Sequence, residues 1–210
     1  MDADRKEGKK MARYGMVIDM KKCIGCHACT MACKAEQNVP NEIFWSTVLE
    51  KEVGLFPKVT RVFLPVLCNH CRNPWCVHVC PTGATHQRDD GIVMMDYELC
   101  IGCRACAVAC PYQARTRVED NRTLYGDGVT VFEKPVVKPI EKGVSSKCNF
   151  CFHRVDQGRV PACVEVCPTE CRIFGDLEDK ESKVFELLGS GRAFQLMPEK
   201  GTDPAVYYIR

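Results

Sequence analysis

The chain has 210 residues, of which 46% are hydrophobic, and this length suits one compact unit or two small ones. Its 29 basic and 27 acidic residues give a formal charge of +2, which excludes the strongly basic surface of a general nucleic-acid-binding protein. No stretch approaches the roughly twenty uninterrupted apolar residues of a membrane span, so we expect the chain to be soluble by itself.

The N-terminal part predicts a tail followed by a strand, a cysteine loop and a helix. Residues 1–10 are mostly charged, with no apolar stretch and no paired arginines, which predicts a disordered tail without an export signal; an upstream start before Met11 is the alternative. The apolar run over residues 16–19 predicts a strand. After Cys29, alanine and methionine recur without a helix breaker, so we expect a helix that runs on toward Gln37.

The middle and C-terminal parts predict a hairpin and several short elements. Asp89, Asp90 and Gly91 supply a turn between residues 84–87 and an apolar run that reaches Met95, as expected for a β-hairpin. A short helix should follow Cys106 and end before Pro111, which limits its continuation. Farther along the chain we expect a surface insertion over residues 118–145, a helix over residues 180–188 and a strand over residues 205–209.

Sixteen of the 17 cysteines fall into four motifs with ferredoxin-like spacing, the most informative feature of the chain. In order, the motifs are Cys23, Cys26, Cys29 and Cys33; Cys68, Cys71, Cys76 and Cys80; Cys100, Cys103, Cys106 and Cys110; and Cys148, Cys151, Cys163 and Cys167. In such a motif three thiolates can hold three corners of one iron–sulfur cube, while the fourth cysteine ligates a different cluster. Four motifs therefore predict four [4Fe-4S] clusters.

Two other uses of clustered cysteines fit the chain less well. A disulfide framework is typical of small secreted chains that cannot build a core, whereas this chain has 210 residues and no signal peptide. Structural zinc sites pair two Cys-x-x-Cys knuckles across a longer spacer, and they do not need three cysteines within a single short run. The spacing therefore favours iron–sulfur clusters over disulfides and over zinc.

The gaps between the motifs indicate how the motifs pair. Nineteen residues separate Cys80 from Cys100, a compact spacing like that between the halves of a small two-cluster ferredoxin, whereas the outer gaps hold 34 and 37 residues. We therefore predict an α+β fold of two nested bacterial-type two-cluster ferredoxin units. The inner unit would span residues 60–117, the outer unit residues 11–59 and 146–178, and a C-terminal extension residues 179–210. Pairing of the first motif with the second is the alternative.

Other side chains near the motifs could act on bound clusters or have simpler roles. Histidines inside the motifs could donate hydrogen bonds to cluster sulfurs, although packing or solvent contact is commoner; they are His27, His70 and His78. Aromatic residues could shield clusters from water or belong to the core; they are Trp45, Trp75, Phe150 and Phe152. Basic residues could offset cluster charge or be ordinary surface charges; they are Lys21, Lys22, Arg72, Arg104, Arg115 and Lys147.

The motif order and its flanking residues resemble a known family. Asp19 and Asp96 each stand four residues before a motif, and Cys167 is followed by Pro-Thr-Glu-Cys171-Arg-Ile-Phe-Gly-Asp-Leu-Glu-Asp179. These features resemble the four-cluster electron-transfer subunit of complex iron–sulfur molybdoenzymes, the dimethyl sulfoxide reductase family. The segment after Cys167 and the ending at Arg210 are most similar to subunits of polysulfide or thiosulfate reductases and respiratory arsenate reductases.

This resemblance implies that the clusters are ligated crosswise. The implied ligands are Cys23, Cys26, Cys29 and Cys167 (the first set); Cys33, Cys148, Cys151 and Cys163 (the second set); Cys68, Cys71, Cys76 and Cys110 (the third set); and Cys80, Cys100, Cys103 and Cys106 (the fourth set). Nitrate-reductase relatives carry tryptophan at the second position of the third motif, whereas Cys103 here implies a complete cube. Cys171 belongs to none of the four sets. We expect it to be a buried structural thiol, and the alternative is that it serves as a cluster ligand.

The resemblance also implies a function without catalysis in this chain. Cubes held by four thiolates offer no open coordination position, and the sequence contains no nucleophile–base constellation or phosphate loop. We expect a subunit that relays single electrons between a molybdopterin-containing catalytic subunit and a quinone-linked membrane anchor or soluble carrier, in a respiratory oxidoreductase acting on a sulfur or arsenic compound. An autonomous soluble polyferredoxin is the alternative.

The expected location follows from the same resemblance. A complex at the membrane, on its periplasmic or outer face after co-export with a signal-bearing partner, is the expected arrangement. A cytoplasmic location is the alternative.

Overall fold

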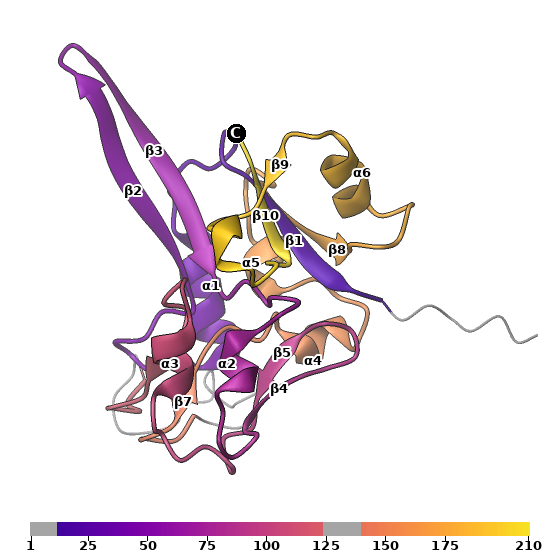
Figure 1. Cartoon of the computed structure of the whole chain (residues 1–210). Coiled ribbons are helices and arrows are strands. Elements are labelled where there is room, and N and C mark those ends of the chain that lie inside the picture. The colour runs from indigo at the N-terminus through magenta and orange to yellow at the C-terminus, as the bar shows by residue number, and fades with distance from the viewer. Residues whose placement is uncertain (1–11, 124–139) are drawn as a thin grey trace, which may run out of the picture.

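The computed structural model describes residues 12–123 and 140–210, which form a mixed α+β fold of short elements (Figure 1). The strands are β1 (Tyr14–Asp19), β2 (Ser46–Leu55), β3 (Lys58–Leu67), β4 (Thr85–Gln87), β5 (Val93–Met95), β6 (Thr116–Arg117), β7 (Ser145–Ser146), β8 (Arg172–Asp176), β9 (Ala193–Phe194) and β10 (Val206–Ile209). The helices are α1 (Ala28–Gln37), α2 (Trp75–His78), α3 (Ala105–Ala109), α4 (Phe152–Val155), α5 (Ala162–Glu165), α6 (Lys183–Gly189) and the 3-10 helix η2 (Pro198–Lys200).

A four-stranded sheet brings the two ends of the described chain together. Its strand order is β8-β1-β10-β9, with β1 antiparallel to β8 and parallel to β10. Because successive side chains of a strand point to opposite faces, Met16 and Ile18 enter the main core. Val17 instead packs with Val184 of α6 and Ile209 on the other face. Strands β1 and β10 and helix α6 confirm the elements predicted from the sequence at these places.

The smaller predicted elements are also present. The β4–β5 hairpin closes through a turn in which the Asp90 carboxylate accepts a hydrogen bond from the Ile92 amide at 3.1 Å. Helix α1 reaches Gln37, as predicted, although it starts one residue before Cys29. Helix α6 starts at Lys183 instead of residue 180, because the Ser182 hydroxyl caps it by accepting a hydrogen bond from the Phe185 amide at 3.1 Å.

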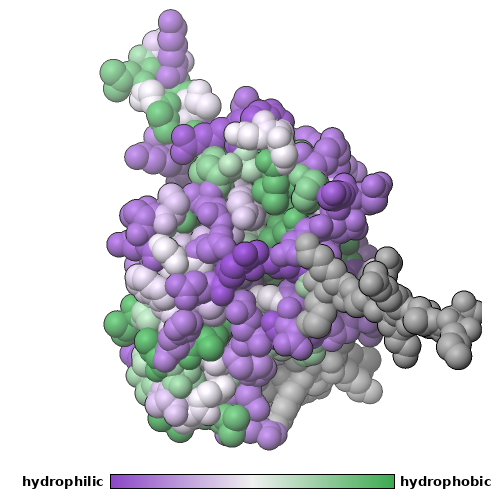
Figure 2. Space-filling model, turned by 45° about the vertical axis from the view of Figure 1, so that its right-hand side comes forward, coloured by the Kyte–Doolittle hydropathy of each residue, from purple (hydrophilic) through white to green (hydrophobic). Residues whose placement is uncertain are grey.

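A long hairpin, β2–β3, was not predicted and stands clear of the body of the molecule (Figure 1). We call it the arm. Its outer half is exposed, and Phe56 near the tip is 93% exposed. One face is polar, with Arg61 paired to Glu50 and Glu52. The alternation of the strands places Leu49 and Val53 on the opposite face, and the space-filling view shows apolar atoms reaching the arm's free end (Figure 2).

The surface insertion predicted over residues 118–145 lies partly outside the described residues, and the predicted tail over residues 1–10 lies wholly outside them. The described ends of the insertion correct the prediction. Val118, Ile140 and Val144 are buried in the main core, because pairing of β6 with β7 draws both ends of the segment inward.

Contacts between distant segments position the cysteine motifs. Pairing of β1 with β8, and packing of α1 against α5, join the first motif to the fourth. Helix α2 packs against α3, which joins the second motif to the third. The C-terminal segment contributes the internal strand β10 and is therefore an integral part of the sheet.

Candidate functional site

The loop of the first motif folds around residues with left-handed backbone conformations. Gly25 has φ 68° and His27, just before α1, has φ 57°. The third motif repeats this pattern, with Gly102 at φ 66° and Arg104 at φ 64°. A side chain at Gly102 would also meet the Gly143 carbonyl, so glycine is required there for conformation and for space. Because both loops have left-handed conformations at equivalent positions, the two loops bend in the same way.

The first set of cysteines lines one cavity. Cys23, Cys26, Cys29 and Cys167 line a small, partly open cavity. Three of these thiols come from the loop and start of α1, and Cys167 comes from the segment that follows α5. The structure therefore brings together residues far apart in the sequence.

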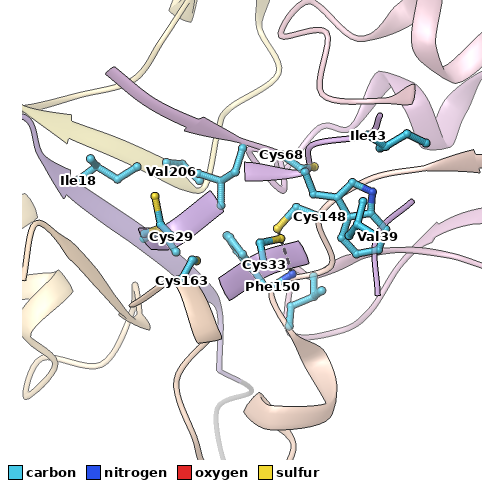
Figure 3. Packing of buried hydrophobic residues seen from close by; sticks show 14 of the residues in the cluster. Ile18, Cys29, Cys33, Val39, Ile43, Cys68, Cys148, Phe150, Cys163 and Val206 are labelled. Carbon is cyan, nitrogen blue, oxygen red and sulfur yellow. Dashed lines mark hydrogen bonds between the residues drawn. The ribbon is translucent and has the colours of Figure 1, made fainter. Parts of the chain in front are cut away.

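The second set is the most deeply buried. Figure 3 shows the sulfurs of Cys33 and Cys148 facing one another in the core, where the Cys148 sulfur also accepts a hydrogen bond from the Phe150 amide at 3.5 Å. Burial, then the nearby thiols of Cys148 and Cys163, raise the pKa of Cys33 well above its ordinary value. Burial likewise raises the pKa of Cys151 to about 11. Thiols in this state require a cationic group if they are to ionise together.

The third set gathers beside a buried arginine. Burial, then the neighbouring Cys68, raise the pKa of Cys71 to about 12, and Cys76 and Cys110 act in the same direction. Arg115 is buried, and its Nη2 atom donates a hydrogen bond to the Cys76 sulfur at 3.1 Å. A cation thus faces this set from inside the protein.

The fourth set is joined through the packing of α2 against α3. The sulfur of Cys80 accepts a hydrogen bond from the Thr85 amide at 3.4 Å, and that of Cys100 accepts one from the Ser145 amide, also at 3.4 Å. Cys106 is buried in α3, whereas Cys103 is exposed. This set is thus open to solvent at Cys103, as the first set is at Cys26.

The histidines of the motifs take structural or surface roles. His70 is fully buried, stacks on Phe150 with ring centroids 3.7 Å apart, and accepts a hydrogen bond from the Val93 amide at 3.0 Å. Burial keeps its pKa well below the ordinary value, so the ring is neutral. His27 and His78 are exposed, and His27 lies at the edge of the first cavity.

The other residues noted near the motifs divide into buried and exposed groups. Lys147 is buried, and its ammonium donates a hydrogen bond to the Cys148 carbonyl at 2.7 Å. Trp45 is a buried core residue whose indole donates to Ser146 at 3.1 Å, whereas Trp75 is 39% exposed. The basic residues at the surface are Lys21, Lys22, Arg72 and Arg104, of which the two arginines form ion pairs.

Cys171 is buried, and its sulfur accepts a hydrogen bond from the Cys167 thiol at 3.5 Å. Cys171 also borders the first cavity. The thiol is therefore close enough to affect the first set while remaining part of the core.

Arg172 is a residue that the sequence analysis did not single out. It is buried, and none of its three guanidinium nitrogens has a hydrogen-bond partner among the described residues. Burial alone would lower its pKa, but the thiolates of Cys163 and Cys29 raise it instead. Its place directly after Cys171 was the available signal, because a cation beside a thiol-rich segment balances negative charge.

The described part of the chain contains neither a site for a single metal ion nor a membrane-spanning helix. Within residues 12–123 and 140–210, no three cysteine, histidine or acidic side chains converge closely enough to hold a single metal ion. None of the helices in these same ranges has the length and apolar character needed to cross a membrane.

Comparison with known proteins identifies the family. Two families of 4Fe-4S dicluster domains match the chain, one over residues 59–125 and 133–177 and the other over residues 22–84. The chain is 41% identical to the arsenate respiratory reductase iron–sulfur subunit of Shewanella sp., across 94% of this chain and 96% of that protein.

Two further relatives match over most of the chain. The B subunit of tetrathionate reductase from Salmonella typhimurium is 41% identical, across 98% of this chain and 76% of that protein. The corresponding polypeptide of polysulfide reductase from Wolinella succinogenes is 36% identical, across 94% of both proteins. With its four cysteine motifs and dicluster domains, the chain belongs to the iron–sulfur B subunits of the dimethyl sulfoxide reductase family.

Proposed function

We propose that this chain relays single electrons through four [4Fe-4S] clusters between a molybdopterin-containing catalytic subunit and a quinone-linked membrane anchor or soluble carrier. The observation that carries the proposal is the gathering of cysteines from distant segments, above all Cys167 with the thiols of the first motif around one cavity. When bound, a four-iron cube accepts and releases one electron.

The proposed ligands are the four sets named above, and the donor chemistry supports them. Thiolates are the usual ligands of iron–sulfur clusters. The raised pKa values in the second and third sets reflect thiols that are crowded together away from water. Buried Arg115 and Arg172 would offset part of the negative charge of loaded sites. Cys103 completes the fourth set, which supports a full cube there.

The nested organisation is part of the proposal. We assign residues 11–59 and 146–178 to an outer two-cluster unit, and residues 60–117 to an inner unit. The contacts of β1 with β8 and of α1 with α5 support the outer unit, and the packing of α2 on α3 supports the inner one.

The proposed partners and substrate follow from the relatives. Those relatives are named for reductases of arsenate, tetrathionate and polysulfide, so we infer a complex that acts on an arsenic or sulfur compound. Exposed apolar residues on the arm, such as Leu55 at 86% exposure, support a chain that is covered by other subunits. We place the complex at the membrane, on its periplasmic or outer face.

The test is to purify the complex anaerobically from its native host. We expect about sixteen iron atoms and as many sulfides per chain, together with a stably bound larger subunit that contains molybdenum. Zinc in place of iron would contradict the clusters. Full iron content in a chain that purifies without any partner would favour the autonomous polyferredoxin instead.

A further inference from the structure

Arg172 carries a charge into the interior without an ordinary partner. It is the first residue of β8, lies opposite Ile18 of β1 in the sheet, and is only 2% exposed. Its Nε, Nη1 and Nη2 atoms lack hydrogen-bond partners among the described residues. A buried guanidinium with unmet donors strongly destabilises a fold unless a negative group faces it. The fold therefore requires a counter-charge at this place.

The groups around Arg172 are thiols from two different sets. Arg172 lines the cavity formed by the first set, to which Cys29 belongs. Helix α5, which carries Cys163 of the second set, packs against β8, the strand of Arg172. Cys163 and then Cys29 act to raise the pKa of the guanidinium. The guanidinium thus lies between two groups of candidate ligands.

A second buried arginine shows what an ordinary ion pair looks like in this protein. Arg154 is 5% exposed, and its guanidinium binds the Glu36 carboxylate at 2.9 Å and also contacts Glu165. Such carboxylate partners explain the burial of Arg154. The groups that act on the guanidinium of Arg172 are instead thiols, which carry negative charge once they ionise, and the neutral Tyr208 hydroxyl.

We propose that Arg172 donates hydrogen bonds to sulfurs of both the first and the second set, and so raises the reduction potentials of both centres together. The inference rests on the proposed ligand sets. A guanidinium presents five N–H donors in a planar fork, so one side chain can serve acceptors on two sides. Each centre gains one electron on reduction, no bond forms or breaks, and the guanidinium keeps its proton. Its fixed positive charge favours the reduced, more negative form.

The experiment is a redox titration of the anaerobically purified complex with dithionite, followed by electron paramagnetic resonance. The first and second centres are assigned through the signals lost in Cys26→Ser and Cys33→Ser variants. In Arg172→Met we expect the midpoint potentials of both centres to fall, while those of the other two stay unchanged. The matched control is Arg115→Met, which removes a buried arginine beside Cys76 and should shift the third centre instead.

Iron and sulfide contents are measured before the titration. Wild-type complex without iron would overturn the proposed function itself. Arg172→Met complex that keeps its iron, yet shows an unchanged midpoint for either of the two centres, would overturn only the role of Arg172.

If the Arg172→Met variant fails to assemble, a second measurement tests the proposal without it. Wild-type protein is labelled with ¹⁵N-arginine, and spin-echo spectra of the reduced first and second centres are compared with those of Arg172→Lys. We expect ¹⁵N coupling in both wild-type signals and its loss from both in Arg172→Lys. Coupling in neither signal, or in one signal alone, would overturn the proposal.

Discussion

The guanidinium of Arg115 donates a hydrogen bond to the sulfur of Cys76 at 3.1 Å, while its other amino group holds the Thr85 hydroxyl at 3.0 Å. The arginine is thus fixed by a neutral group on one side and directed at a candidate ligand on the other. A cation held in this way favours a thiolate at Cys76.

Replacing Arg115 by methionine should lower the reduction potential of the third centre by tens of millivolts. The reason is that the variant loses a hydrogen bond that stabilises the reduced form of the centre. A loss of about 1 kcal/mol in this stabilisation lowers a one-electron potential by about 40 mV. Redox titration of the variant complex provides the measurement. Arg61→Met, on the exposed arm, serves as the control and should leave all four potentials unchanged. An unshifted third centre in Arg115→Met would mean that the hydrogen bond is not made to a ligand.

Crosswise ligation predicts which substitutions share a phenotype. Cys33→Ser and Cys148→Ser should alter the same paramagnetic signal, whereas Cys26→Ser should alter another, because Cys33 lies with Cys148 in the core and Cys26 lines the first cavity. The three variants are compared by paramagnetic resonance after dithionite reduction. If Cys33→Ser and Cys26→Ser perturbed one shared signal, the nested arrangement of the outer unit would be wrong.

Loading of the bare chain should release protons. The pKa of Cys71 is raised to about 12 and that of Cys151 to about 11, so both thiols are protonated from pH 7 to 9 and must lose their protons to become ligands. We expect about one proton per thiol, and cluster binding that tightens as the pH rises toward these pKa values. Calorimetry of anaerobic reconstitution in buffers of different ionisation enthalpy measures the release. Hydrosulfide also loses its proton on becoming cluster sulfide, so a release of only one proton per sulfide, with none from cysteine, would show that the thiols are already ionised.

Arg154 should be essential for the loop that carries three members of the second set. Its guanidinium links Glu36 of α1 to the Val160 carbonyl and to Glu165. Arg154→Met would leave Glu36 partly buried without this partner, and we expect a loss of about 3 kcal/mol in the free energy of unfolding. Thermal unfolding of the loaded protein, together with its iron content, tests this.

The matched control for that variant is Arg159→Met, which removes an exposed arginine that pairs with the same Glu165. Arg159→Met should lower the free energy of unfolding by less than about 1 kcal/mol, because exposed ion pairs contribute little to stability. If Arg154→Met and Arg159→Met lowered the free energy of unfolding equally, the buried ion pairs of Arg154 would not be what stabilises the loop.

Cys171→Ala should keep all of the iron. The thiol packs in the core beside Cys167, so its removal is expected to cost about 1 kcal/mol of stability without removing a ligand. Iron analysis and paramagnetic resonance of the purified variant provide the measurement, with Cys167→Ser as the comparison that should lose the first centre. A loss of about four iron atoms in Cys171→Ala would make Cys171 a ligand.

The cysteine motifs and the elements next to them could be predicted because local chemistry determines them. Strand β1, the β4–β5 hairpin and α6 follow from apolar runs, turn residues and a cap. The arm was not predicted, although its strands alternate apolar and charged residues and Gly54 and Pro57 flank the turn at Phe56. Its exposed outer half gains no core contacts, so burial gave no reason to expect it.

Arg172 escaped sequence reasoning for a different reason. Its importance depends partly on Cys29, which is far away in the chain and meets it only after β1 pairs with β8. The other thiol, Cys163, is nine positions before it in the sequence and approaches it through the contact of α5 with β8. The burial of Val118 and Ile140 likewise depends on a distant pairing, that of β6 with β7. Contacts of this kind are set mainly by topology, so the place of Arg172 directly after Cys171 was the one local signal for them.

The position of β10 between β1 and β9 determines the order of events during biosynthesis. A nascent chain cannot complete this sheet until the ribosome has added the residues of β10, and Cys167 emerges long after Cys23. The growing polypeptide must therefore carry reduced, unligated thiols through most of translation. In the proposed ligand sets the first and second centres therefore wait for the fourth motif, whereas the third and fourth are complete at Cys110. The waiting thiols need a reducing compartment in which they neither oxidise nor pair incorrectly.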